Sequence, residues 1–157
     1  MPELRKFKNN EYKELMPFMA PLWEDTYKNI IPEEHIKFLL EKYFLPENTE
    51  KFVKDGYEYY YLTDNGEKCG IIVIHPLENE VYLDKLYFAF SARGKGYARF
   101  VINELKKYGK DITLNVNRNN LKAYNVYIAL GFKIEEKQEI ALGNGMVNFD
   151  YKMRLKV

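Results

Sequence analysis

The apolar residues in the first third of the chain recur every three or four positions, as they do on one face of a helix. This spacing covers residues 10–28 and 32–43. Pro17 and Pro21 lie inside the first run, and because proline has no backbone N–H to donate, we expect a broken or kinked helix there. A third, shorter helix is expected over Pro46–Lys54, since proline followed by an acidic residue is typical of a helix start. The N-terminal third is therefore predicted to be mostly helical.

The pattern then changes to alternation with a period of two, which is typical of strands. The strand-like runs, including an early one before the helices, are 3–8, 57–63, 69–75, 81–88, 113–116, 132–140 and 147–155. Glycine and asparagine mark tight turns at Asp64–Glu67 and Gly143–Gly145. Helical spacing returns in residues 98–108 and 120–131, and Gly109 is placed to cap the end of the first of these helices.

The predicted elements follow the order strand, helices, three strands, helix, strand, helix and two strands. This order predicts an α/β fold, with a mixed sheet and helices on both of its faces. At 157 residues the chain has the length of one domain, and no repeat, low-complexity tract or linker divides it. Residues 1–157 are therefore expected to form a single domain.

Composition and charge narrow the class of protein. The net charge is +1, so no overall field attracts nucleic acid or an anionic membrane, and we expect neither as a partner. No run of about 18 apolar residues is present, so no membrane span is expected. Cys69 is the one cysteine and is expected to be a buried small apolar residue; without an internal disulfide the chain fits a reducing compartment. With no signal-peptide pattern at the N-terminus, we expect a cytoplasmic protein. No metal site is predicted.

A glycine-rich segment joins the strand-like run at 81–88 to the next helix. It reads Arg93, Gly94, Lys95, Gly96, Tyr97 and Ala98. A turn of this kind before a helix presents several free backbone N–H groups in one direction, and the helix dipole adds partial positive charge at the same place. A phosphate or pyrophosphate can bind there, because glycine lets the backbone approach closely and adopt positive φ. The side chains of Arg93, Lys95 and Arg99 can add positive charge to such a site or can simply be solvated.

The spacing of the glycines and basic residues distinguishes among the known types of phosphate-binding loop. A Walker loop is excluded because the lysine lies between the two glycines, and a dinucleotide loop is disfavoured because Arg99 stands at the third small position. The segment does match the pattern [QR]-x-x-G-x-[GA] at Arg93, Gly96 and Ala98, and it resembles the coenzyme A pyrophosphate loop of the GNAT family of acyltransferases. A second motif of that family, V-x-x-x-N-x-x-A-x-x-x-Y-x-x-x-G-F, is matched at Val116, Asn120, Ala123, Tyr127, Gly131 and Phe132.

The resemblance implies a mainly antiparallel sheet in which one strand pair splays apart to hold coenzyme A, with acetyl-CoA as the cofactor. The pyrophosphate would lie on the backbone N–H groups of residues 93–98. The pantetheine arm would pair with the exposed backbone of Leu86, Tyr87 and Phe88, and a backbone N–H near Tyr87 or Phe88 would receive the developing oxyanion. Asn120 would bind the cofactor, or alternatively cap its helix. Homodimers are common in the family, and the sequence itself leaves the oligomeric state open.

Tyr127 is the candidate general acid that protonates the leaving thiolate. A thiol of pKa about 8.5 and a phenol of pKa about 10 are close enough to share or transfer a proton as the C–S bond breaks. The alternative is a core tyrosine on an apolar helix face. The spacing of the second motif favours the catalytic role for Tyr127.

The base that deprotonates the amine is less clear from the sequence. Many relatives carry a glutamate fourteen residues before the motif glycine, and that position here is Tyr82, which we assign instead to the acceptor site. Glu80 and Asp84 lie two residues to either side, on the same strand face by the period of two. Either carboxylate can serve through a water molecule, or both can be solvated at a strand edge.

The acceptor is expected to be a small amine held by the N-terminal helices and the last hairpin, as the resemblance implies. Candidate contacts are Trp23, Glu24 and Tyr27. Residues 20–50 contain seven acidic residues and three lysines, a net charge of −4, which favours a cationic acceptor such as a polyamine. The Trp-x-x-Thr-Tyr run and the late glycine turn are also similar to bacterial polyamine acetyltransferases. A protein N-terminus or lysine as acceptor, and a non-catalytic acetyl-CoA sensor, remain alternatives.

Overall fold

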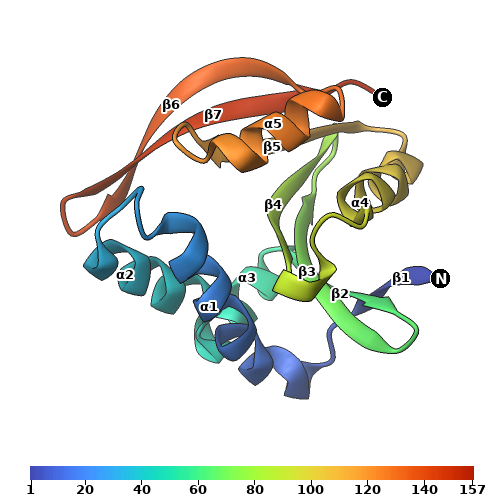
Figure 1. The fold of residues 1–157 in the computed structure, drawn as a ribbon, viewed down its shortest axis with the longest axis horizontal. Helices are drawn as coiled ribbons and strands as arrows, with labels where there is room; N and C mark the ends of the chain where they lie inside the picture. The colour runs from blue at the N-terminus through green and yellow to red at the C-terminus, as the bar shows by residue number, and fades with distance from the viewer.

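The structure is a computed structural model that describes residues 1–157. Its centre is one seven-stranded sheet with the order β1-β2-β3-β4-β5-β7-β6 (Figure 1). The strands are β1 (Pro2–Lys6), β2 (Glu58–Asp64), β3 (Glu67–Pro76), β4 (Glu80–Phe88), β5 (Asp111–Asn117), β6 (Lys133–Gly143) and β7 (Met146–Leu155). All neighbouring strands are antiparallel except β4 and β5, which are parallel. The predicted α/β fold with a mixed, mainly antiparallel sheet is confirmed.

Five α-helices cover the two faces of the sheet. They are α1 (Leu15–Tyr27), α2 (Glu33–Phe44), α3 (Pro46–Lys54), α4 (Tyr97–Leu105) and α5 (Leu121–Ala129). α1 and α2 bury their apolar faces with Tyr61 and Val73 of β2 and β3, whereas α4 and α5 pack on the opposite face around Ile72 and Val101. Figure 1 shows α1, α2 and α3 on one side of the central strands and α4 on the other. None of these helices combines the length and the apolar character needed to cross a membrane.

The first helical run differs in detail from the prediction. A 3-10 helix over Asn9–Glu14 precedes α1, and α1 then continues without a break to Tyr27. Pro17 lies in the first turn, where a helical N–H has no partner in any case, and the helix accommodates Pro21 within its length. The interruption expected at the prolines therefore lies before Leu15 instead.

Two of the predicted turns form as expected. Asn65 and Gly66 have φ values of 51° and 82° between paired Asp64 and Glu67, which is the geometry of a two-residue hairpin. α4 ends in a 3-10 turn that Gly109 closes with a φ of 68°.

β4 and β5 separate halfway along their length. They pair from Glu80 with Asp111 to Leu83 with Leu114, and no pairing follows. At the same point β4 contains a bulge, since Val73 of β3 pairs with Lys85 and Ile74 pairs with Leu83, which leaves Asp84 as an extra residue. A bulge bends and twists its strand. The splayed strand pair predicted from the family resemblance is present.

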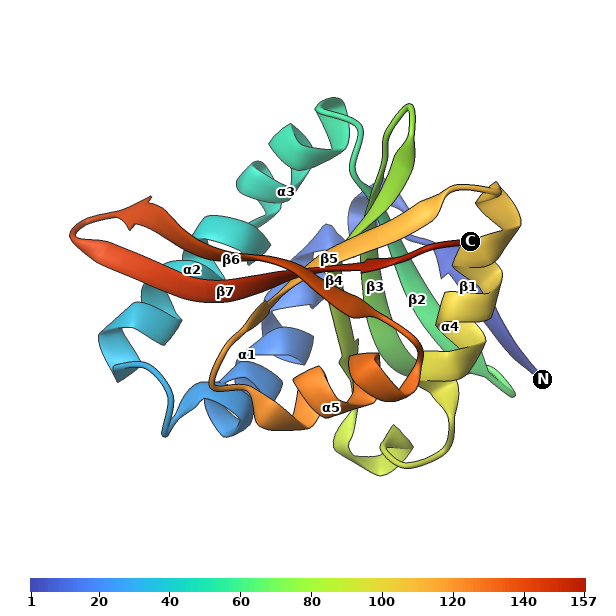
Figure 2. The same ribbon diagram turned by 90° about the horizontal axis from the view of Figure 1, so that it is seen from above.

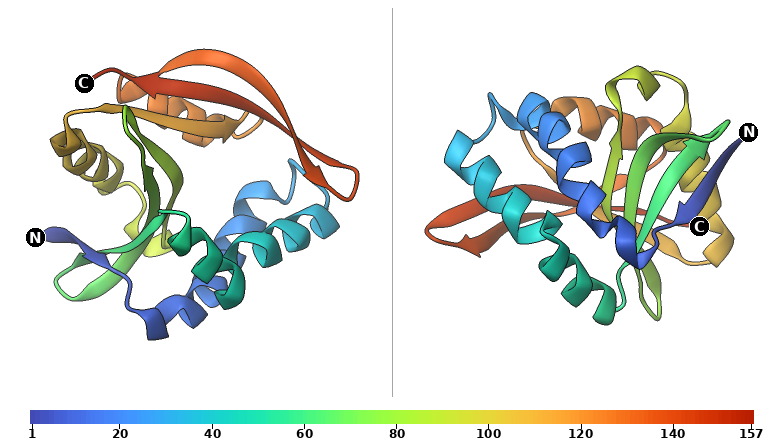
Figure 3. Two further views of the ribbon diagram at one scale, coloured as in Figure 1. Left: turned by 180° about the vertical axis from the view of Figure 1, so that it is seen from behind. Right: turned by 90° about the horizontal axis from the view of Figure 1, so that it is seen from below.

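The β6–β7 hairpin extends beyond the sheet toward α2. Figures 2 and 3 show its tip passing along α2, far in sequence from it. Leu142 of β6 packs into the core under α1 and α2, and Lys42 of α2 donates a hydrogen bond to the Leu142 carbonyl at 3.3 Å. The hairpin therefore closes over the N-terminal helices and forms a wall of the space between them and the sheet.

Candidate active site

Two cavities meet where β4 and β5 separate. One, of about 460 Å³, lies on the side of α1, α2 and the β6–β7 hairpin, and we call it the acceptor cavity. The other, of about 550 Å³, lies against the loop before α4, and we call it the cofactor cavity. Their shared walls are Leu86, Tyr87, Asn120, Ala123 and Tyr127. The fold therefore brings residues of β4 and of the second motif to one junction.

The loop before α4 has the backbone expected of a phosphate site. Gly94 and Gly96 adopt φ values of 76° and 79°, and no protein atom lies within 4 Å of where a Cβ would stand at either one. The N–H groups from Gly94 to Arg99 donate no hydrogen bond within the protein. Several N–H donors at a helix N-terminus beside an open cavity fit a pyrophosphate, so this loop suits coenzyme A.

The charged and aromatic side chains of the loop have different partners. Arg93 pairs with Asp25 of α1 at 3.3 Å, so it ties the loop to the N-terminal helices. Tyr97 donates a hydrogen bond to Asp64 at 2.6 Å and anchors the loop to the β2–β3 turn. Lys95 and Arg99 line the cofactor cavity and form no ion pair. These two cations of the loop are free to meet phosphate oxygens.

The end of β4 forms the wall where the pantetheine arm is expected. Leu86, Tyr87 and Phe88 line the cofactor cavity together with Ala98. The edge of β4 that faces β5 has no strand partner beyond Leu83, which leaves an edge to which an extended ligand can add. A Cβ at Gly70 would come within 2.8 Å of the Tyr87 carbonyl oxygen, so only glycine lets β3 approach β4 this closely. Sequence reasoning missed that role, although a glycine inside a strand signals a close backbone approach.

Three phenols surround the junction of the cavities. The hydroxyls of Tyr27 and Tyr87 are hydrogen-bonded to each other at 2.8 Å, across α1 and β4. Tyr127 packs edge-on against Phe132, and its hydroxyl has no hydrogen-bond partner in the protein. Burial raises the pKa of Tyr127 above that of an ordinary phenol, and the neighbouring Tyr27 adds to the rise. Tyr127 therefore keeps its proton at neutral pH and has it available to donate.

Asn120 has a position compatible with both roles predicted for it, the helix cap and the cofactor contact. Its Oδ1 accepts a hydrogen bond from the N–H of Ala123 at 3.3 Å, so it caps α5. It also lines both cavities. The cap fixes the side chain at the junction, where the cofactor role predicted from the second motif stays a proposal.

The acceptor cavity has largely aromatic walls. Trp23, Tyr27, Tyr43, Tyr57, Tyr82 and Tyr87 all contribute to it. Lys85 is buried in the same wall, where its Nζ lies 4.2 Å from the centroid of the Tyr43 ring and 2.9 Å from the Asp84 carboxylate. The wall thus already holds one ammonium group by an ion pair and a cation–π contact.

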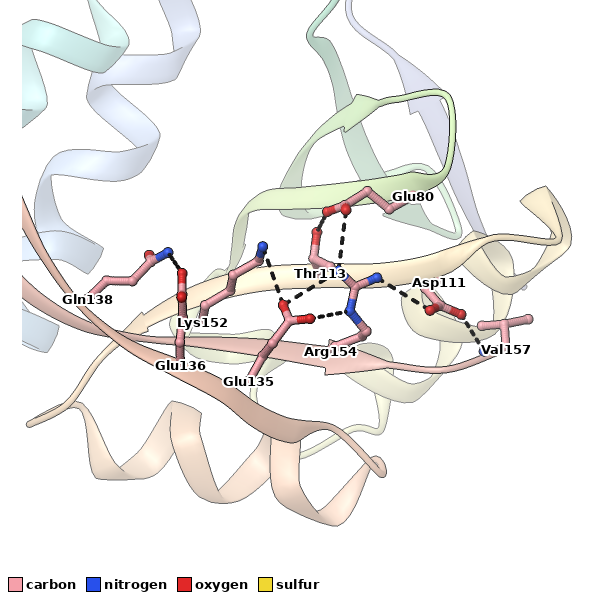
Figure 4. A network of polar contacts seen from close by, with 9 residues as sticks. All are labelled: Glu80, Asp111, Thr113, Glu135, Glu136, Gln138, Lys152, Arg154 and Val157. Carbon is pink, nitrogen blue, oxygen red and sulfur yellow. Dashed lines mark hydrogen bonds and ion pairs between the residues drawn. The ribbon is translucent and has the colours of Figure 1, made fainter.

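The two carboxylates expected to serve as base lie in different places. Asp84 lines the acceptor cavity, but Glu80 does not. Glu80 accepts a hydrogen bond from Thr113 and pairs with Arg154 at 3.4 Å, within the surface network that Figure 4 shows. Four residues separate the two along β4, about 13 Å of strand. Sharing a strand face therefore does not bring Glu80 to the site.

The acidic stretch over residues 20–50 does not supply the charge of the cavity. Glu24, one of the expected acceptor contacts, is exposed and lines neither cavity, and none of the other acidic residues in this range lines the acceptor cavity. Helix geometry explains this, because Trp23 and Tyr27 point inward and Glu24 then lies about 100° away around α1. The acidic residues of this stretch, which were expected to favour a cationic acceptor, therefore do not line the acceptor cavity.

A carboxylate that the sequence did not single out lies in the cavity wall. Asp150 of β7 is 7% exposed and lines the acceptor cavity. Burial raises its pKa to about 6, against the opposing influence of Arg118 and Lys85. An acidic residue at an inward-facing position of a strand would have indicated such a site. The sequence alone does not tell which face of β7 is covered, so this signal could not be used.

Comparisons with known proteins agree with this geometry. The model of the Acetyltransferase (GNAT) family matches residues 16–132. The peptidyl-lysine N-acetyltransferase YjaB of Salmonella typhimurium is 24% identical over 96 residues, which are 61% of this chain and 63% of that protein.

Solved structures share the fold over the whole chain. The PaiA N-acetyltransferase of Thermoplasma acidophilum, in complex with coenzyme A, has a TM-score of 0.81 at 22% identity and covers 100% of this chain and 99% of its own. The spermidine N-acetyltransferase of Vibrio cholerae, in complex with CoA and spermine, has a TM-score of 0.71 at 17% identity, with 99% and 95% covered. Since the family model spans well over half of the sequence and includes both motifs, the chain belongs to the GNAT family of acetyltransferases.

Proposed function

We propose that the protein transfers the acetyl group of acetyl-CoA to a primary amine of a small cationic acceptor such as a polyamine. The observation that carries this proposal is the meeting of two cavities at Tyr127. One cavity suits a pyrophosphate and its extended arm, and the other is an aromatic space with carboxylates in its wall. An amine in the acceptor cavity and a thioester in the cofactor cavity would both contact the residues that the two cavities share.

The residues that would hold the cofactor form a continuous path. The N–H groups of residues 94–99 would bind the pyrophosphate, with Lys95 and Arg99 adding positive charge. The free edge of β4 at Leu86, Tyr87 and Phe88 would pair with the pantetheine arm and place the acetyl group beside Tyr127. Bound acetyl-CoA supplies an activated acetyl group as a thioester. A backbone N–H near Tyr87 or Phe88 would then stabilise negative charge on the carbonyl oxygen.

Tyr127 is the proposed general acid. Its hydroxyl is without a partner, lies at the junction and is protonated at neutral pH, so it can donate its proton to the departing thiolate. The edge-on contact with Phe132 helps to hold the Tyr127 ring in place. A general acid works best from a fixed position beside the reacting atoms.

A small cation suits the acceptor cavity better than other amines. Its volume of about 460 Å³ is in the range of small-molecule sites. Tyr43 already binds the ammonium of Lys85, which shows that these aromatic walls accept a positive group. The fold shared with a spermidine N-acetyltransferase is consistent with a polyamine.

A peptide lysine is the second candidate acceptor. The similarity to a peptidyl-lysine N-acetyltransferase favours it, and a lysine side chain offers the same primary amine as a polyamine. A polyamine and a peptide lysine differ in the rest of the acceptor, because a peptide also needs a protein surface to bind its backbone.

Release of free thiol from acetyl-CoA in the presence of different acceptors tests the proposal. We would compare spermidine, spermine, amino acids, aminoglycosides and short lysine peptides with a reaction that lacks an acceptor. Release with the polyamines and not with the peptides is expected. Release with peptides alone would identify a peptidyl-lysine enzyme, and tight acetyl-CoA binding without release would favour a sensor.

A further inference from the structure

Asp150 is a buried carboxylate without a partner. Its residue exposure is 7%, its side chain accepts no hydrogen bond, and it forms no ion pair. The nearby cations are engaged elsewhere. Arg118 donates to the carbonyl oxygens of Asp150 and Gln138, and Lys85 pairs with Asp84. The Asp150 carboxylate therefore has no direct partner within the protein, although Arg118 and Lys85 act on it from a distance, and an incoming cation can supply that partner.

The side chain of Asp150 points into the acceptor cavity. The next residue, Tyr151, packs against Tyr124 of α5 on the far face of the sheet, with the ring centroids 5.6 Å apart and the rings tilted. Because successive side chains of a strand point to opposite faces, Asp150 faces the side of α1 and α2. Burial raises the pKa values of Tyr43 and Tyr27, two rings that line this cavity, and the charge of Asp150 adds to both rises.

Asp84, the other carboxylate of the cavity, is in a different state. It forms an ion pair with Lys85 at 2.9 Å, so its charge is already balanced. Of the two, Asp150 alone is free to receive an incoming ammonium group.

We propose that Asp150 binds the ammonium group of the acceptor and removes its proton before acetyl transfer. This inference rests on the proposed function and names the base that the sequence left open. It assigns a catalytic role to β7, which lies outside both family motifs.

The reaction balances with the groups present. One proton passes from the ammonium to the Asp150 carboxylate, and the amine nitrogen is then free to attack. The nitrogen forms a bond to the acetyl carbon, and the bond from that carbon to sulfur breaks. The sulfur takes the proton of Tyr127, and the phenolate of Tyr127 takes the second proton of the nitrogen. Asp150 returns its proton to solvent, which accounts for the one proton released in the overall reaction.

The surroundings of Asp150 are consistent with a base that works near neutral pH. The titratable and charged groups that interact electrostatically with it are Tyr27 from α1, Tyr43 from α2, Tyr82 and Lys85 from β4, and Arg118 after β5. Burial raises the pKa of Asp150 to about 6, so it is charged at pH 7.5 and accepts a proton more readily than an exposed carboxylate.

The test is the pH profile of kcat/KM for spermidine with the wild type and with Asp150→Asn. Without the base, only the rare neutral amine reacts. We expect kcat/KM to fall about 10²-fold at pH 7.5. The deficit should shrink by up to about tenfold per pH unit as the pH rises toward the amine pKa of about 10.4. Acetyl-CoA affinity should be unchanged, which also reports an intact fold.

Asp111→Asn is the matched control, because Asp111 lies on β5 outside both cavities and pairs with Arg154. A deficit in Asp150→Asn that stays constant from pH 6 to 9.5, or no deficit at all, would overturn the assignment.

A second measurement keeps the two proposals separate. If the wild type binds acetyl-CoA but turns over no amine, the proposed function fails, and spermidine binding to the complex with CoA then decides the role of Asp150. Weaker spermidine binding in Asp150→Asn than in the wild type and Asp111→Asn would support the ammonium contact. Equal affinity in all three would overturn it.

Discussion

Tyr127 has a hydroxyl without a hydrogen-bond partner in the protein, and its side chain lies at the junction of the two cavities. A structural tyrosine in a half-buried position normally finds a hydrogen-bond partner. Tyr124, one turn earlier on α5, also has a hydroxyl without a hydrogen-bond partner and packs against Tyr151, but it lines neither cavity. Position at the junction, which Tyr127 has and Tyr124 lacks, is therefore what separates the chemical role from a packing role.

Tyr127→Phe should lower kcat by about 10²-fold, because the thiolate then departs without an acid. Acetyl-CoA affinity should change little, since the ring and its contact with Phe132 remain. Stopped-flow or steady-state thiol release gives kcat, and fluorescence titration gives the affinity. Tyr124→Phe is the matched control and should keep the wild-type kcat. Equal rates for Tyr127→Phe and the control would remove Tyr127 as the acid.

At the scale of elements, the glycine loop and α4 act as one unit. The helix supplies the dipole and the last free N–H groups, and the loop supplies the open approach through Gly94 and Gly96. Arg93 and Tyr97 fix the loop to α1 and to the β2–β3 turn, so the site is held from both sides.

Gly96→Trp should block cofactor binding by filling the space that the pyrophosphate needs. Loss of two charge-assisted hydrogen bonds at about 1.5 kcal/mol each weakens binding by about 10²-fold. Gly66→Trp is a close control, because Gly66 has a φ of 82° and equally open surroundings but lies in the β2–β3 turn, away from both cavities. Calorimetry with acetyl-CoA compares the two variants. Equal affinities would show that the loop does not bind the pyrophosphate.

The helices and strands were easier to predict from the sequence than the way in which they pair and pack. Period and turn chemistry located all seven strands and the β2–β3 turn, because those signals are local. The bulge at Asp84 and the end of β4–β5 pairing at Leu83 depend on strands far apart in sequence, and only the family resemblance anticipated the splay. For the same reason Glu80 was grouped with Asp84, although the structure places it in the network with Arg154.

At the scale of the whole molecule, the acceptor cavity is built from parts that no local pattern joins. α1 and α2 provide aromatic rings, β4 provides Asp84 and Lys85, and β7 provides Asp150. The β6–β7 hairpin extends over the N-terminal helices (Figure 2). The hairpin depends on its contact with α2 through Lys42 and Leu142. The acidic residues of the cavity therefore come from β4 and β7 and not from the acidic N-terminal helices.

That arrangement has a cost in stability which can be measured. The pKa of Asp150 is raised from its ordinary value of 3.8 to about 6, so the folded protein binds a proton there more tightly than the unfolded chain does. Between these pH values stability falls as the pH rises, and above about pH 6 the full cost of the buried charge is present. The difference corresponds to about 3 kcal/mol of unfolding free energy.

Asp150→Asn should therefore be more stable than the wild type at pH 7.5, by up to about 3 kcal/mol, because the amide carries no charge to bury. The gain should disappear below about pH 4, where the wild-type carboxyl is protonated in both states. Urea unfolding at pH 7.5 and pH 3.5 measures it, with Asp111→Asn as the control that loses an ion pair and gains nothing. A variant that is less stable than the wild type at both pH values would mean that Asp150 has a structural partner. A gain at neutral pH together with a loss of turnover would mark a charge that the fold retains for the amine it binds.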